Sequence, residues 1–348
     1  MICAPASAEP SRHNWLSGRS TWSANSSYSR AVEVNGSVMN SVDSQEYLDG
    51  SGRVEARYLA FLETVTTLRP SLHRYCARMT GSIMDGEDVV QEALIEAYRK
   101  LDKYDESRPL KPWLFRIAHN RCIDFLRRKG VRDEAEAAAA MSEAVSPAEP
   151  ATLGIGKAVE HLVASLPPKE RACILLKDVF DYSLEEIAEL VDSTVGGVKA
   201  ALNRGRTKLA SSPASSPSVR SADPELAQIM QLYVDRFNRR DWDGVRELIS
   251  ADARLNVLDR FAGKFADAPY FFNYDRWPWH WKLALGEVDG EPVLIVLQRG
   301  ADTWTSYSVI RMRVVGQEIE QIVDYIHCPW MIPAATSISL VGSREMRD

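Results

Sequence analysis

The net charge changes from negative to positive between residues 85 and 130 of the chain. Residues 85–106 contain eight acids and three bases, whereas residues 107–130 contain seven bases and one acid. A basic segment can hold nucleic acid because its phosphate contacts release counterions, and an acidic neighbour suits a basic protein partner. Ordinary solvated helix faces with ion pairs between successive turns would give a similar pattern, so charge alone leaves both interpretations open.

The basic segment carries its polar side chains at helical spacing. Apolar residues recur every three or four positions from Leu114 to Phe125, which predicts a helix with one buried side. Polar groups on its other side could reach base edges or phosphates together. Trp113, at the start of the segment, is more typical of a core anchor than of a platform for stacked bases. The polar residues in question are Arg116, Asn120, Asp124 and Arg127.

A second basic helix is expected in residues 181–209, which have the layout of a helix-turn-helix. A helix with an apolar face leads to a turn with a Ser/Thr cap at 192–194. The next helix has four bases and no acid between Lys199 and Lys208. A recognition helix needs donors in its first turns and phosphate-binding bases further along. The alternative is a basic surface helix without such a function.

Helical periodicity and breaks in composition divide the chain into parts. Stretches rich in Ser, Asn, Pro and Ala have little to bury, which predicts a disordered start and flexible linkers. The expected fold class is multidomain, with two all-α domains followed by one α+β domain. The expected parts are a disordered extension (1–52), a three-helix domain (53–130), a linker that begins as a helix (131–156), a helix-turn-helix domain (157–210), a flexible linker (211–222) and the α+β domain (223–348).

The α+β part should open with two amphipathic helices, at 224–239 and 242–250. Two strand pairs follow, one joined by the turn residues Asp289-Gly290 and the other at Gly316-Gln317. Three tryptophans spaced two positions apart are predicted to share one face of a strand. They are Trp277, Trp279 and Trp281.

Composition excludes several classes of protein. The chain has no apolar run of about 18 residues, so no bilayer-crossing helix is expected, and its start lacks the features of a secretory signal. We therefore expect a cytoplasmic protein. Its five cysteines stand singly without a CxxC pair, which favours buried side chains over disulfides or a zinc site. No metal or cofactor is expected.

Two stretches resemble a known family. Residues 85–129, which include DGEDVVQEALIEAY and WLFRIAHNRCIDFLRRK, resemble the second region of the extracytoplasmic-function (ECF) sigma factors. Residues 166–209, which include LPPKERACILL and VGGVKAALNRGRTKL, resemble their fourth region. The resemblance spans about 58–209, in the family's order. It implies a bacterial factor that directs core RNA polymerase to promoters and initiates transcription, and that is not an enzyme.

The resemblance also implies roles for individual residues. In the family, the acidic helix binds the clamp of the largest polymerase subunit, the next helix recognises and melts the minus-ten element, and the fourth region reads the minus-thirty-five element near the polymerase flap. Gly196-Gly197 departs from the family's pattern and weakens the expectation for the start of the last helix. The implied residues are Asp85, Glu87, Asp88, Gln91 and Glu92 for polymerase; Trp113, Arg116, Asn120, Arg121, Asp124 and Arg127 for minus-ten DNA; and Thr194, Lys199, Asn203, Arg204 and Arg206 for minus-thirty-five DNA.

Typical members of the family stop soon after the fourth region, so residues 223–348 form an extension. Its two helices before a curved sheet resemble the SnoaL-like cone fold. The resemblance implies a domain that contacts the sigma domains and regulates activity in cis, helped by the high effective concentration of a tethered partner. The aromatic side chains would also suit a ligand pocket, lined by Trp277, Trp279, Trp281 and Trp304.

Two rival interpretations stay open. A stand-alone helix-turn-helix regulator would bind duplex DNA without polymerase, but it gives the acidic helix no role. A bifunctional enzyme would use the cone for proton transfer, with either Asp324 and His327 or Asp275 and His280 as acid and base. Structural roles for these histidines, and core packing of the tryptophans, are favoured over catalysis.

Overall fold

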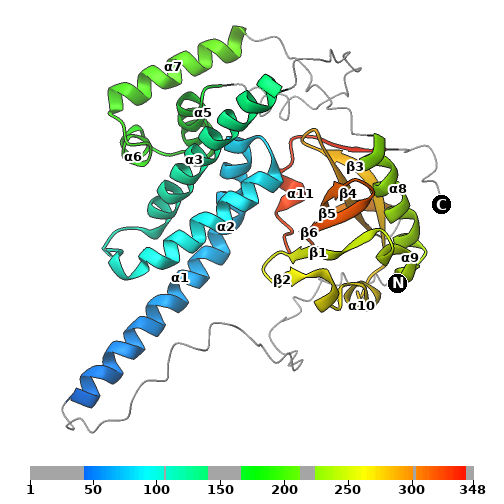
Figure 1. Ribbon diagram of the computed structural model, residues 1–348. Coiled ribbons are helices and arrows are strands. Elements are labelled where there is room, and N and C mark those ends of the chain that lie inside the picture. Colours follow the sequence, from blue (N-terminus) through cyan, green and yellow to red (C-terminus); the bar gives the residue numbers. More distant parts are fainter. Residues whose placement is uncertain (1–42, 106, 140–165, 212–223, 301–302, 342–348) are drawn as a thin grey trace, which may run out of the picture. The chain divides into compact units, whose positions relative to one another are not determined.

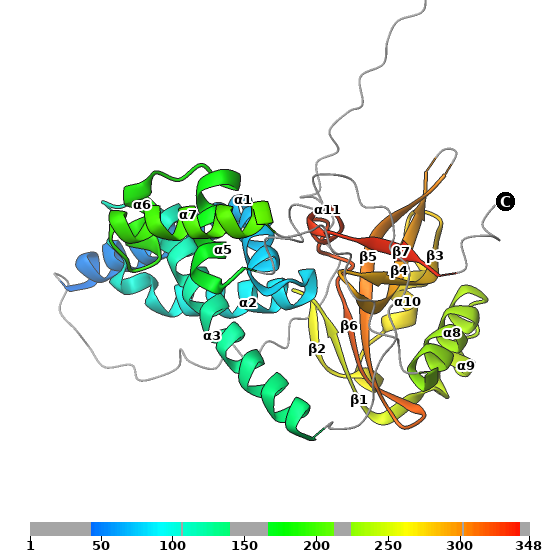
Figure 2. The ribbon, with the colours of Figure 1, turned by 90° about the horizontal axis from the view of Figure 1, so that it is seen from above.

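The computed structural model describes residues 43–105, 107–139, 166–211, 224–300 and 303–341 of the chain (Figures 1 and 2). Contacts divide the chain into two compact units, residues 1–58 and residues 59–348. Every candidate site residue belongs to the second unit.

Three long helices form the first helical part. Gly81, with a φ of 84°, ends the first helix, and the Ser82 side chain caps the second by accepting a hydrogen bond from the Asp85 N–H. A short 3₁₀ turn then leads into the loop before the third helix. The elements are α1 (Asp43–Thr80), α2 (Ile83–Lys100), η1 (Leu101–Lys103) and α3 (Leu110–Ala139).

The helix ends differ from some of the predicted boundaries. Helix α1 begins at Asp43, ahead of the expected domain start at residue 53, and α3 continues to Ala139, so the start of the 131–156 segment is helical as expected. The remainder of that segment lies outside the described residues, as do residues 1–42 of the predicted disordered extension and residues 212–222 of the predicted flexible linker.

The second helical part has the predicted helix-turn-helix. Ser183 and Glu186 form a reciprocal capping box at the start of α6, and the Thr194 hydroxyl accepts a hydrogen bond of 3.0 Å from the Gly197 N–H at the start of α7. The helix thus starts regularly despite Gly196-Gly197. The elements are α5 (Pro168–Ile174), the π-helical turn η2 (Leu175–Val179), α6 (Leu184–Leu190) and α7 (Val195–Ser211).

One apolar core serves both helical parts. Phe115 of α3 lies against Phe180 and Tyr182, with ring centroids 5.5 and 5.6 Å apart. The Arg171 guanidinium, from α5, donates hydrogen bonds to the backbone oxygens of Met79 and Leu166. Burial of these rings in a shared cluster stabilises the packing of the two helical parts.

Residues after 223 form an α+β domain, which confirms the predicted class. The seven strands form one sheet in the order β2-β1-β6-β5-β4-β3-β7, in which β1 and β6 are parallel and all other neighbours are antiparallel. The elements are α8 (Pro224–Asn238), α9 (Trp242–Arg246), β1 (Ile249–Val257), β2 (Phe261–Lys264), η3 (Phe265–Asp267), α10 (Tyr270–Asp275), β3 (Trp281–Val288), β4 (Glu291–Arg299), β5 (Trp304–Val315), β6 (Glu318–Asp324), α11 (Met331–Ala334) and β7 (Ile338–Leu340).

Both predicted hairpins are present. Asp289 and Gly290, with φ of 53° and 79°, form the turn between β3 and β4, as a type I′ turn requires. Gly316, with φ of 60°, lies in the turn between β5 and β6. The helix predicted at 242–250 is shorter than expected, because it ends at Arg246 and Ile249 already pairs with β6.

Each face of the sheet has its own core. Along β4, Leu294 and Val296 belong to one cluster of buried residues, which also contains the side chains of α8 and α10. Val293, Ile295 and Leu297 face the other way and belong to a second cluster with Met331 and Ala334 of α11. This second cluster also includes three fully or almost fully buried residues of the helical part: Ala77, Ile83 and Met84.

The prediction that three tryptophans alternate on one strand is wrong. Only Trp281 lies in a strand, the first position of β3, whereas Trp277 and Trp279 belong to the loop after α10. Pro278 lies between them and has no N–H to donate to a strand ladder, which explains why the strand begins later.

The cysteines in the described part of the chain are Cys76, Cys122, Cys173 and Cys328, all buried and free, as the sequence predicts. None of the helices in the described residues is long and apolar enough to cross a membrane.

Candidate functional site

The acidic helix α2 packs closely on the end of α1. A Cβ on Gly86 would lie 2.5 Å from the backbone nitrogen of Ala77, so only glycine permits this approach. The close packing buries the first turn of α2, where Asp85 and Glu87 lie, and leaves Asp88 and Glu92 exposed. Gln91 is half-buried between them. The five predicted polymerase-binding residues therefore do not form one open patch.

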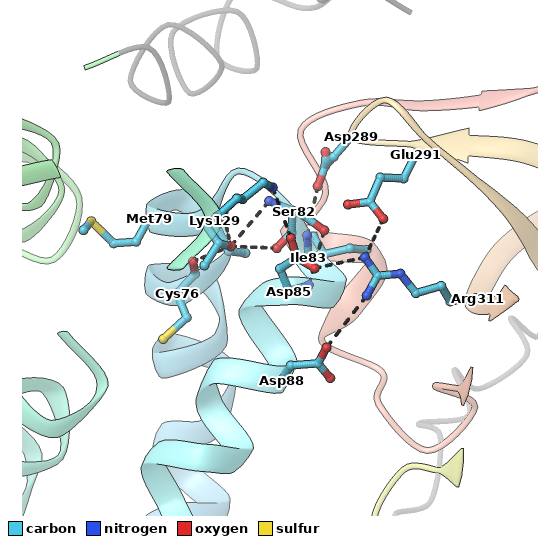
Figure 3. Close-up of polar contacts among 12 residues, drawn as sticks. Cys76, Met79, Ser82, Ile83, Asp85, Asp88, Lys129, Asp289, Glu291 and Arg311 are labelled. Atoms are coloured by element: carbon cyan, nitrogen blue, oxygen red, sulfur yellow. Dashed lines mark hydrogen bonds and ion pairs between the residues drawn. The ribbon is translucent and has the colours of Figure 1, made fainter. Parts of the chain in front are cut away.

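Arg311 of β5 contacts two of these acids (Figure 3). Its Nη2 lies 2.9 Å from Asp85 Oδ1 and 2.8 Å from Glu291 Oε2, and its Nη1 lies 3.8 Å from Asp88 Oδ2. Lys129 of α3 approaches the other oxygen of Asp85 at 3.4 Å. Asp85 is thus shared between a base of the α+β domain and a base of α3.

Glu87 is fully buried and bound on both carboxylate oxygens. Arg69 of α1 lies 2.5 Å from Oε1, and the indole N–H of Trp330 donates to Oε2 at 2.9 Å. The Arg69 guanidinium also lies 4.8 Å from the centre of the Trp330 ring and 2.8 Å from Asp259 Oδ2. Burial raises the pKa of Glu87 above its usual range, and the Arg69 charge opposes that rise.

Asp289 caps helix α2 from the β3–β4 turn. One of its oxygens, Oδ2, accepts a hydrogen bond of 3.2 Å from the Ile83 N–H, where α2 begins. The other accepts from the Thr336 and Ser337 N–H groups at 2.7 and 3.1 Å. A carboxylate at a helix N-terminus is favourable because the N–H groups there lack partners in the helix. The local sequence predicts Asp289 only as a turn residue and gives no signal for this contact.

The minus-ten candidates lie along α3 in differing surroundings. Trp113 is half-buried, with its ring centroid 4.7 Å from that of Tyr104, and it lines a cavity of about 630 Å³ together with Arg116. Glu186 and Glu189 of α6 also line this cavity. Aromatic side chains beside a positively charged arginine would suit the binding of an unstacked nucleobase.

The other minus-ten candidates lie further along α3. Asn120 is exposed and lines a second, open hollow together with Asp124. Arg127 lies 3.1 Å from Asp124 Oδ1, one turn away on the same helix. Arg121 instead points to α2, with its Nε 2.5 Å from Glu96 Oε2.

The minus-thirty-five candidates all lie on the exposed side of α7 or at its cap. Lys199, Asn203, Arg204 and Arg206 are all exposed. Arg204 and Arg206 also pair with acids of the same helical part. Arg204 Nε lies 2.8 Å from Glu170 Oε1, and Arg206 Nη2 lies 2.6 Å from Asp178 Oδ1. Thr194 serves as the helix cap.

The four tryptophans do not converge on one pocket. Trp277 and Trp279 contact each other, with centroids 5.1 Å apart, and Trp281 meets Trp277 through Tyr274. Trp304 packs against the core on the other face of the sheet, between Lys282 and Arg299.

The suggested acid and base groups have structural partners. Asp324 is fully buried and accepts hydrogen bonds of 2.7 Å from both Tyr270 and Tyr274, and one of 2.9 Å from the Ile326 N–H. Burial raises its pKa to about 6, although the tyrosine hydrogen bonds oppose the rise. His327 is half-buried beside the Trp277 ring.

The second suggested pair also has other partners. Asp275 accepts a hydrogen bond of 3.0 Å from the Trp242 indole, and His280 is exposed. Among the described residues, no cluster of His, Cys, Asp and Glu has the composition of a metal site.

Comparisons with known proteins identify the class. Residues 64–132 match the family Sigma-70 region 2, and residues 156–209 match Sigma-70, region 4. The chain is 33% identical over 162 residues to the ECF RNA polymerase sigma factor SigW of Bacillus subtilis, covering 43% of this chain and 87% of SigW. The chain belongs to the ECF RNA polymerase sigma factors, a family of transcription initiation factors rather than enzymes.

Further similarity extends beyond the two sigma regions. The ECF sigma factor SigG of Mycobacterium tuberculosis is 28% identical over 331 residues, covering 85% of this chain and 89% of SigG. This coverage includes much of the α+β domain. A solved structure of a ketosteroid isomerase-type protein from Kribbella flavida is 20% identical, with a TM-score of 0.24, and it covers 29% of this chain and 76% of its own.

Proposed function

We propose that this ECF sigma factor binds core polymerase through α2, opens the minus-ten element with α3 and reads the minus-thirty-five element with α7, while its C-terminal domain restrains the first of these steps. The polymerase contacts would be the largest-subunit clamp for α2 and the flap for the helix-turn-helix part. Such a factor would work in the cytoplasm, where polymerase and template meet.

The observation that carries the regulatory part is the set of contacts on the first turn of α2. Arg311 binds the Asp85 carboxylate, and Trp330 binds the Glu87 carboxylate. These contacts occupy carboxylate oxygens to which a basic polymerase surface would have to bind. A carboxylate that is buried and fully hydrogen-bonded must lose those partners before it can accept others. Polymerase and the C-terminal domain would therefore compete for α2.

The test is the affinity of core polymerase for the full chain with Arg311→Gln. Removing the guanidinium releases Asp88 and leaves Asp85 with Lys129 alone, at a cost of about 1–2 kcal/mol in contacts with the C-terminal domain. We expect polymerase to bind about five- to thirtyfold more tightly, with a matching rise in runoff transcription at limiting sigma factor. A gain cannot come from misfolding.

The matched control is Arg313→Gln, on the same strand. Arg313 is paired with Glu320 at 3.0 Å, and its side chain is 61% exposed, so its loss removes the same charge without touching α2. The control should leave polymerase affinity unchanged. Equal affinities for both variants and the parent chain would overturn the restraining role of Arg311.

A further inference from the structure

Acidic side chains of α2 pair with basic side chains of α3 as well as with Arg311 of the C-terminal domain. Glu92 Oε2 lies 3.9 Å from Arg121 Nη1 and 3.5 Å from Arg128 Nη2, both on α3. Glu96, one turn later, holds Arg121 more closely, at 2.5 Å. Asp85 holds Lys129 at the far end of the same seam.

These pairs neutralise much of the charge that α3 would offer to DNA. Arg121, Arg128 and Lys129 each face a carboxylate of α2, and Arg127 faces Asp124 of α3. A phosphate group that approaches such a base must compete with the carboxylate for its charge and its N–H donors. The acidic and basic segments of the sequence therefore form ion pairs with each other in the folded chain.

The pairs differ in how easily they can open. Although its partial burial acts in the opposite direction, hydrogen bonds from Lys100 and Arg121 lower the pKa of Glu96, so this carboxylate is firmly held. Glu92 is more exposed, with 46% of its side chain accessible, and its two contacts are longer. An outside cation can reach Glu92 more readily than Glu96.

We propose that Glu92 forms a charge lock with Arg128: in the free chain Glu92 holds Arg128, and a basic polymerase surface that binds Glu92 releases Arg128 to DNA phosphates, while Arg121 stays paired with Glu96. This inference rests on the proposed docking role of α2. It gives Arg128, which the family resemblance does not single out, a DNA-binding role. Polymerase docking and DNA binding would then strengthen each other equally, because coupling between two sites is reciprocal.

The first test uses the full chain without polymerase and a labelled single-stranded DNA of mixed sequence. Glu92→Gln should raise affinity about three- to tenfold at low salt. It should also steepen the dependence of log affinity on log salt by about 0.7, because the released Arg128 neutralises one more phosphate. Glu63→Gln is the matched control because it makes the same charge change on exposed α1. Equal effects of the two variants would overturn the lock.

A double variant guards against an indirect effect. Adding Arg128→Gln to Glu92→Gln should remove most of the added salt dependence, because the released base is then missing. Persistence of the full steepening in the double variant would contradict the role of Arg128. This assay contains no polymerase, so failure of the docking role leaves its result unchanged and the two proposals can fail separately.

The second test adds purified core polymerase. Single-stranded DNA should tighten polymerase binding by the parent chain, and this increase in affinity should be at least halved in Glu92→Gln, in which Arg128 is already free. If the increase is the same in both, Glu92 does not couple the two partners. If polymerase binds Glu92→Gln as tightly as the parent while DNA affinity alone has risen, release by polymerase is refuted, and only the hold of Glu92 on Arg128 in the free chain stands.

Discussion

At the scale of single residues, the buried carboxylates of this chain are held by side chains from distant parts of the sequence. Glu87 depends on Arg69 and Trp330, and Asp85 on Lys129 and Arg311. Sequence patterns identified the acids because their spacing resembles the family's acidic helix. They could not identify the partners, since no local pattern links position 85 to position 311.

Asp324 gives a prediction for pH dependence. Its pKa of about 6 in the folded chain lies above the usual value of an aspartate, so the folded state holds its proton more tightly than the unfolded state does. Its contribution to stability is therefore present below pH 4 and is lost as the pH rises to 6. The free energy of unfolding of the parent chain, minus that of Asp324→Asn, should fall between pH 4 and 6 and then level off.

Urea titrations at each pH, followed by tryptophan fluorescence, measure that difference. Taking the difference removes the effect of other groups, such as His327, whose pKa is lowered by burial and whose contribution has the opposite slope. A difference that is constant from pH 4 to 7, or that grows with pH, would refute the assignment to Asp324.

At the scale of elements, local chemistry predicted the turns and caps well. Asp289-Gly290 makes the expected hairpin turn because both residues adopt positive φ, and Ser183 with Glu186 caps α6. The spacing of the three tryptophans wrongly predicts a strand across them, because Pro278 has no N–H to donate and β3 begins only at Trp281. The predicted helix at 242–250 is too long because Ile249 belongs to β1, where it pairs with Ile319. Local sequence does not reveal this contact.

The close packing of α1 and α2 gives a second prediction. Gly86→Ala should destabilise the chain by about 1–3 kcal/mol, although alanine favours helices, because its Cβ would meet backbone rather than a side chain that could move. Gly130→Ala in α3, with open space around the Cβ, should instead be neutral or stabilising by up to about 1 kcal/mol. Unfolding by urea distinguishes the two, and equal effects would contradict the tight packing at Gly86.

At the scale of the whole second unit, α2 lies at the meeting point of three sets of contacts. Its apolar start shares a buried cluster with the C-terminal domain, its first acids bind Arg311 and Trp330, and its later acids bind α3. The class and the two sigma regions could be predicted from sequence because they depend on local motifs. The convergence on α2 could not, because it depends on contacts between residues more than 200 positions apart, such as Asp85 and Arg311.

Hydrogen exchange of the full chain with and without core polymerase tests the central claim, that polymerase displaces the C-terminal domain from α2. If polymerase displaces the domain, exchange should become slower in α2 on binding and faster in the 328–336 segment and in the Asp289-Gly290 turn, which lose their contacts with that helix. Slower or unchanged exchange in those two segments while α2 becomes protected would show that polymerase and the C-terminal domain bind α2 together, and would contradict displacement.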